Sequence, residues 1–323
     1  MSEFEPMHDG NEQAQSLRDE LPPESSAPVV QPAETPLTAS EGSYFANYAQ
    51  PFIDDERTPH FGHVALLLPL MLLGWLASSL LLHFALKLHL YGMSTPEQAI
   101  NDVHYTIGSM GIFYLVTFIS GLFVFPLFWQ KSFFAGIGWN GLEAIRRRKT
   151  LVIAACMCFV LAIVDEIALP GPTDAPIDKL FRSPTEAWML LVFGITFAPF
   201  FEEMAFRGFL LPALATAIDW AFERTTARPR LPLTPDGQPQ WSTGAMIGGA
   251  MITSLPFALI HGYQTSYAIG PFVLLYSVSL VLCAVRLRTR SLAASVMVHA
   301  CYNTLIFSFL VIGTSGFKHL ERM

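Results

Sequence analysis

The sequence predicts an all-α membrane protein, a polytopic bundle of about seven transmembrane helices with a polar intramembrane cavity. Of its 323 residues, 52% are hydrophobic and only 14% are charged, whereas a soluble domain is about 25% charged. The mean hydropathy is +0.42. The apolar residues also form runs of about 20, which match the roughly 30 Å hydrocarbon core of a bilayer.

Residues 1–58 precede the first apolar run and differ from the rest in composition. They are polar, acidic and rich in proline, so they cannot bury enough apolar area to offset their chain entropy. They also lack the basic start and apolar stretch of a signal peptide. We predict a disordered N-terminal tail at 1–58 and one membrane-embedded helical domain at 59–323.

Seven apolar segments follow, separated by short polar links. They lie at about 62–90, 105–129, 150–169, 185–221, 243–262, 267–285 and 291–315. Pro199 in the fourth segment and Pro256 in the fifth predict a break and a kink, because proline removes a helical hydrogen bond. Gly244 and Gly248 form a GxxxG motif, which predicts close helix packing.

The basic residues between the segments predict the orientation. They cluster in three links that alternate correctly: "RRRK" at 146–149, three arginines within 224–230, and "RLRTR" at 286–290. Basic links tend to stay in the cytoplasm. We therefore expect a cytoplasmic N-terminus, a far-side C-terminus and a multi-pass protein of the plasma membrane, or of the inner membrane in a bacterium.

Composition also limits the partners. No basic block indicates nucleic acid, and nothing in the sequence indicates an oligomeric state. The four cysteines lie in or beside apolar runs without a CxxC pair, which favours packing over a disulfide framework or a metal site. These are Cys156, Cys158, Cys283 and Cys301.

Most titratable residues of the apolar segments lie near segment ends. We interpret these as interfacial or snorkelling side chains. They are His63, His83, Lys87, His104, Asp165 and Glu166.

Five ionisable residues lie deeper: Glu202, Glu203, Arg207, His261 and His299. They fall on the fourth, fifth and seventh segments, and intramembrane polar residues usually converge inside a bundle. Glu203 and Arg207 are four residues apart, so they share a helix face and can pair. Glu202 is rotated by about 100° from Glu203 and remains free to act as a general base.

Two further residues share faces with the histidines. Asn303 lies four residues after His299, and Phe257 four residues before His261. A carboxylate base, a supporting ion pair, two imidazoles and an amide are the groups that water-activated hydrolysis needs. From the residues alone a proton-coupled transporter stays open, because transporters also bury glutamate, arginine and histidine.

Three motifs in these segments resemble a known family. "EEMAFRG" resembles the EExxxR motif, "FALIH" the FxxxH motif and "HACYN" the HxxxN motif of the CAAX protease and bacteriocin-processing (CPBP or Abi) family of intramembrane proteases, which includes the type II CAAX prenyl endopeptidases. The order is the same, and the resemblance covers about 185–310. The link at 222–242 is longer than the family pattern leads us to expect.

The resemblance implies a hydrolase that cleaves a peptide bond in a membrane-associated, CAAX-like protein or peptide. Glu202 would activate water, with support from Glu203, Arg207 and the FxxxH phenylalanine. The catalytic set would be completed by His261, His299 and Asn303, the last of these at the oxyanion.

The sequence has no HExxH motif of a conventional zinc protease. Glu202, His261 and His299 can bind a divalent metal such as zinc with an open position, as in a metalloendopeptidase. A metal-free glutamate mechanism fits these residues as well, and we favour it. A non-catalytic membrane scaffold or immunity protein is the remaining alternative.

Overall fold

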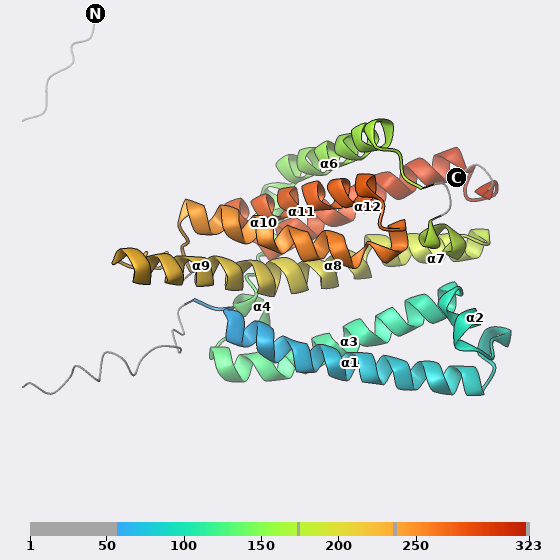
Figure 1. The fold of residues 1–323 in the computed structure, drawn as a ribbon, viewed down its shortest axis with the longest axis horizontal. Coiled ribbons are helices and arrows are strands. Elements are labelled where there is room, and N and C mark those ends of the chain that lie inside the picture. Colours follow the sequence, from blue (N-terminus) through green and yellow to red (C-terminus); the bar gives the residue numbers. More distant parts are fainter. Residues whose placement is uncertain (1–56, 173–174, 235–237, 321–323) are drawn as a thin grey trace, which may run out of the picture. The chain divides into compact units, whose positions relative to one another are not determined.

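A computed structural model describes residues 57–172, 175–234 and 238–320. Within these ranges the chain is helical and contains no strand, which confirms the predicted fold class (Figure 1). Seven stretches of helix are long and apolar enough to cross a membrane. The protein is thus a multi-pass membrane protein. The predicted disordered tail lies outside the described residues except for Arg57 and Thr58.

The first two candidate spans, α1 (Phe61–Lys87) and α3 (Val103–Trp129), pack against each other as a pair. Gly74 allows their close approach, since a Cβ there would lie 2.7 Å from the carbonyl oxygen of Phe113. The short helices η1 (Leu90–Gly92) and α2 (Pro96–Ile100) connect them. Asp102 caps α3 by accepting hydrogen bonds from two backbone N–H groups.

Two short helices, α4 (Phe133–Gly136) and α5 (Gly141–Arg146), lead into the third span, α6 (Arg148–Ala168). After α6, the 3₁₀ helix η2 (Pro176–Leu180) precedes the fourth span. α6 packs against the last two long helices of the chain.

The fourth span is a row of four helical pieces (Figure 1). These are α7 (Pro184–Ile195), α8 (Phe197–Glu203), the π-helix η3 (Met204–Leu210) and α9 (Leu211–Thr226). The break at Thr196 follows from Pro199, which has no N–H to donate to the carbonyl of Ile195. The 43 residues extend over roughly 65 Å at 1.5 Å per residue, about twice the hydrocarbon thickness, so part of this row must lie beyond the bilayer core.

The last three spans are α10 (Thr243–Ile260), α11 (Ile269–Thr289) and α12 (Leu292–Gly313), with the 3₁₀ helix η4 (Tyr263–Thr265) after α10. α10 packs against α9 and α11, and α12 packs against α6, α7, α8 and α11. These contacts bring the fourth, fifth and seventh spans together around α8.

α10 continues through Pro256, and the kink expected there stays a prediction. A Cβ on Gly244 would meet nothing within 4 Å, whereas a Cβ on Gly249 would lie 3.3 Å from the backbone of Ala215 in α9. A Cβ on Gly248 would lie 3.1 Å from the side chain of Ile218, also in α9. The close approach of α10 to α9 is therefore at Gly248 and Gly249, and of the GxxxG motif only Gly244 plays no part in it.

The outer faces of these helices are apolar. Leu68, Phe123 and Ile167 are 60%, 73% and 79% exposed, and many more large apolar side chains are exposed along the spans. On a water-soluble protein such patches would cause aggregation, but they suit a lipid environment. Polar side chains lie inside instead: Thr253, Ser279 and others are fully buried, and they surround the fourth span near its π-helix.

Candidate active site

The two adjacent glutamates at the end of α8 lie in different environments. The side chain of Glu203 is completely buried, whereas that of Glu202 is 14% exposed. One residue step rotates a helical side chain by about 100°, so Glu203 faces the inner helices while Glu202 faces two histidines. The two carboxylates therefore have different partners and different access to water.

Glu203 forms a buried ion pair. Arg207 donates from one terminal nitrogen to Glu203 Oε1 at 2.8 Å, as the spacing predicts. Its other terminal nitrogen donates to the hydroxyl and the carbonyl oxygen of Ser279 on α11, at 2.7 and 3.1 Å. The sequence reasoning missed Ser279; its only signal was a hydroxyl within the apolar run of the sixth segment. The pair fixes η3 against α11.

His299 connects this ion pair to Glu202. Its Nδ1 lies 2.9 Å from Glu203 Oε1. An ionised carboxylate can only accept a hydrogen bond, so Nδ1 carries a proton. In the neutral ring Nε2 then has a free lone pair, and Nε2 lies 3.8 Å from Glu202 Oε2. Glu203 thereby sets both the orientation and the tautomer of the imidazole.

His261 reaches Glu202 from the C-terminal end of α10. Its Nδ1 lies 2.7 Å from the carbonyl oxygen of Phe257, and a carbonyl oxygen is also only an acceptor. Its Nε2 is therefore the free nitrogen, and it lies 3.9 Å from Glu202 Oε2. Both imidazoles present the same kind of atom to one carboxylate oxygen.

The three groups leave space for a small bridging molecule. Separations of 3.8 and 3.9 Å exceed the range of about 2.7–3.2 Å for a direct hydrogen bond. A water molecule can bridge polar groups at such distances. Since Glu202 and the two Nε2 atoms are all acceptors, they suit a water that donates one proton to Glu202 and the other to one of the imidazoles.

The ring of Phe257 packs against several of the site residues. It is buried, with its ring centroid 5.0 Å from that of His261 and 6.0 Å from that of His299. The guanidinium carbon of Arg207 lies 4.5 Å from the same ring centroid, within range of a cation–π contact. One aromatic ring thus packs against both imidazoles and the arginine.

Asn303 is engaged elsewhere. Its side-chain amide donates to the carbonyl oxygen of Gly194 at 2.7 Å, next to the break between α7 and α8. A carboxamide has two N–H donors, so one remains for another acceptor. Asn303 therefore holds the end of α7 in place, and no contact joins it to Glu202, His261 or His299 among the described residues.

Glu202, His261 and His299 fit a zinc ion poorly in this arrangement. With bonds of about 2.0 Å, tetrahedral zinc needs ligand atoms roughly 3.3 Å apart. Here Glu202 is 3.8–3.9 Å from each imidazole. Among the described residues, the trio is not a set whose ligand atoms all lie within 4.8 Å of one another. The donor types suit zinc, but the spacing suits a water better.

A further buried charge lies beside the ion pair. Arg286 of α11 is 9% exposed and donates to the carbonyl oxygens of Arg207 and Ile137, at 3.3 and 3.2 Å. With Arg207 and Arg290 it lines a cavity of about 100 Å³ that does not include Glu202 or the histidines. The polar cavity predicted among the fourth, fifth and seventh spans stays a prediction.

Comparison with known proteins gives one match. A family model described as type II CAAX prenyl endopeptidase Rce1-like matches residues 184–305. That range contains α7 to α11 and most of α12, and with them all seven predicted site residues. No curated protein and no solved structure shows a significant match to the chain.

Proposed function

We propose that the protein is an intramembrane endopeptidase, because residues 184–305 match the model of the Rce1-like type II CAAX prenyl endopeptidases, a peptidase family. Its substrate is a membrane-associated, CAAX-like protein or peptide, since the site residues lie on candidate membrane spans. The observation that carries the proposal is the position of Glu202 between the free Nε2 atoms of His261 and His299.

In the proposed mechanism, Glu202 acts as general base. A water between Glu202 and the imidazoles donates one proton to the carboxylate and attacks the carbonyl carbon of the scissile peptide. The oxyanion that forms accepts a hydrogen bond from the second N–H of Asn303. Glu202 then returns the proton to the leaving nitrogen and the C–N bond breaks. The products are a carboxylic acid and an amine, and proton transfer between them gives a carboxylate and an ammonium ion. No step requires a metal.

The second glutamate has a positioning role in this scheme. Glu203 holds the Nδ1 proton of His299, which keeps Nε2 free to accept from the water. Arg207 and Ser279 hold Glu203 in turn. A buried imidazole with a carboxylate behind it is a better acceptor than an isolated one.

The test is a cleavage assay on purified protein in lipid vesicles, with a farnesylated fluorogenic peptide as substrate. We expect Glu202→Gln to lower kcat by about 10²–10⁴-fold, the usual contribution of a general base, without lowering the unfolding temperature. Glu166→Gln, at an exposed position on α6, is the matched control and should keep full activity.

Two outcomes would contradict the proposal. One is a Glu202→Gln protein that retains more than a tenth of the wild-type cleavage rate. The other is absence of cleavage in the wild type together with a pH-driven flux that Glu202→Gln abolishes, which would indicate the transporter. Comparing the farnesylated peptide with its unprenylated form tests the lipid requirement.

A further inference from the structure

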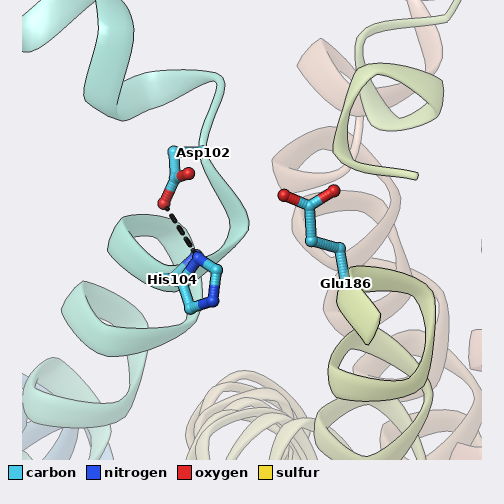
Figure 2. A group of neighbouring side chains, drawn as sticks. All are labelled: Asp102, His104 and Glu186. Atoms are coloured by element: carbon cyan, nitrogen blue, oxygen red, sulfur yellow. Dashed lines mark hydrogen bonds and ion pairs between the residues drawn. The ribbon is translucent and has the colours of Figure 1, made fainter. Parts of the chain in front are cut away.

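A second group of polar side chains lies where α3 and α7 begin, apart from the site described above. Asp102 is the N-cap of α3, His104 lies in the first turn of the same helix, and Glu186 lies in the first turn of α7. Figure 2 shows the carboxylate of Glu186 facing the other two side chains across the gap between the helices. One ligand atom from each of the three residues lies within 4.8 Å of the others.

Two atoms of this group are buried without a hydrogen-bond partner: Nδ1 of His104 and Oε2 of Glu186. Nδ1 lies 3.4 Å from Oδ1 of Asp102, which is too long for a good hydrogen bond. Buried polar atoms almost always have a partner, so each exception needs an explanation. Among the described residues, no lysine or arginine forms an ion pair with Asp102 or Glu186.

The surroundings hold two of the three side chains in place. Asp102 Oδ1 accepts hydrogen bonds from the backbone N–H groups of His104 and Tyr105, at 3.0 and 3.2 Å. The ring of Tyr91 stacks on that of His104, with centroids 4.2 Å apart and planes inclined by 16°. The imidazole and one carboxylate are thus fixed before any ligand binds, and preorganised donors favour binding.

A cavity of about 80 Å³ between α1 and α3 is lined by His104 and Tyr91, but not by Asp102 or Glu186. It therefore meets the proposed site only at the imidazole. A metal ion held by three protein ligands commonly takes water for its remaining positions.

We propose that Asp102, His104 and Glu186 bind a divalent transition-metal ion, with zinc as the best match. One imidazole nitrogen and two carboxylate oxygens suit zinc and manganese better than magnesium or calcium, which prefer oxygen ligands alone. The ion supplies the missing partner of both buried atoms. The three ligand atoms lie within 4.8 Å of one another, which is wider than the roughly 3.3 Å of a tetrahedral zinc site, so the Glu186 side chain has to move toward the other two to bind the ion.

The site has a structural consequence for the enzyme. α1 and α3 lie outside the residues that match the peptidase family, whereas α7 lies inside them and leads directly into α8, which carries Glu202. A metal shared by α3 and α7 therefore joins the N-terminal helix pair to the part of the chain that carries the candidate active site. The inference does not depend on the proposed peptidase activity.

The rival explanation is a protonated His104 between two carboxylates, each also stabilised by a helix N-terminus. That arrangement needs no metal. It predicts that the unfolding temperature does not respond to zinc. One experiment at constant pH therefore distinguishes the two explanations.

The experiment uses the purified full-length protein in detergent, first stripped with a chelator and dialysed. Zinc is then added at pH 7.5, the unfolding temperature is measured, and bound metal is counted after gel filtration. We expect one retained zinc per chain and a rise of several degrees in unfolding temperature. His104→Gln and Glu186→Gln should lose both effects, and His83→Gln, at an exposed histidine of α1, should keep them.

Cobalt provides a second readout that does not depend on the variants folding. Cobalt bound to the stripped wild type should give a visible absorption band that zinc displaces. Glu202→Gln should keep this band, which excludes binding at the candidate active site. Absence of the band in the wild type, no retained zinc, or zinc stabilisation that persists in both His104→Gln and Glu186→Gln would overturn the proposal.

Discussion

The buried ion pair offers the sharpest test of how this structure is stabilised. In Glu203→Gln the side chain keeps its shape and its carbonyl acceptor but loses its charge. Arg207 then remains as a fully buried cation whose other polar partners are the uncharged hydroxyl and carbonyl of Ser279. Breaking a buried pair by removing one partner leaves an uncompensated charge, which is the costly part of such a change.

The expected magnitude follows from the geometry. Both side chains are 0% exposed and their closest atoms lie 2.8 Å apart, so the full burial range of about 3–5 kcal/mol applies. For a protein of this size about 1 kcal/mol changes the unfolding temperature by roughly 2–4 °C, which gives a decrease of about 6–20 °C. His299 also loses its carboxylate partner, so the rate of peptide cleavage should fall with it.

Thermal unfolding in detergent, followed by intrinsic fluorescence, measures this effect. Glu143 and Arg147 form an ion pair with the same four-residue spacing at the end of α5, and Arg147 is 45% exposed. Glu143→Gln is therefore the matched control and should change the unfolding temperature little. The double variant Glu203→Gln/Arg207→Met should be more stable than Glu203→Gln alone, because it removes the unpaired cation. Equal small decreases for both ion pairs, or a double variant less stable than Glu203→Gln, would refute the reasoning.

Three further predictions concern the site and the packing. Asn303→Leu should lower kcat by about 10²–10³-fold, the usual loss for an oxyanion donor, and any change in KM measured in the same assay should be smaller. A strong zinc chelator should leave the cleavage rate of the folded protein within about twofold (a factor equivalent to about 0.4 kcal/mol), and a larger loss that is also seen in His104→Gln, which lacks the proposed structural zinc site, would show that a metal takes part in cleavage. Gly74→Ala should lower the unfolding temperature because its Cβ would press on the carbonyl of Phe113, whereas Gly108→Ala, with open space around it, should not.

The membrane spans were predictable because the lipid bilayer directly constrains the amino-acid composition of a span. A span must be apolar on every side that meets lipid, and its length is fixed by the bilayer. The seven predicted segments correspond one to one to the seven candidate spans. Their ends differ by a few residues. For example, α3 begins at Val103 after its cap Asp102, two residues before the predicted start.

The internal geometry of the fourth span was harder to predict from the sequence. Pro199 predicted a break, and the structure has one at Thr196. Nothing in the residues of 204–210 indicates a π-helix, because its wider turn is a response to packing and not to local propensity. Ser279 was missed for a similar reason: a serine in an apolar helix becomes a partner of Arg207 only after α11 packs on η3.

The same limit explains His104. A histidine at the start of a span is usually interpreted as an interfacial residue. The sequence around His104 gives no reason to expect anything else. Its relation to Glu186 exists only because α3 packs against α7. Clusters formed by residues of one helix can be found from spacing, whereas clusters formed across helices require the contacts between them.

The adjacent glutamates show how one local rule can yield two chemical roles. A single residue step along α8 changes the direction of a side chain by about 100°, which is enough to separate a fully buried carboxylate from one that is 14% exposed. The buried one is neutralised by Arg207, so its charge is tolerated and can orient His299. Among the described residues, the other forms no ion pair with a lysine or arginine, and in the proposed mechanism it takes a proton from water. A base and its support, as proposed, require two neighbouring carboxylates and one arginine a turn later, which would account for three ionisable residues so close together in an apolar stretch.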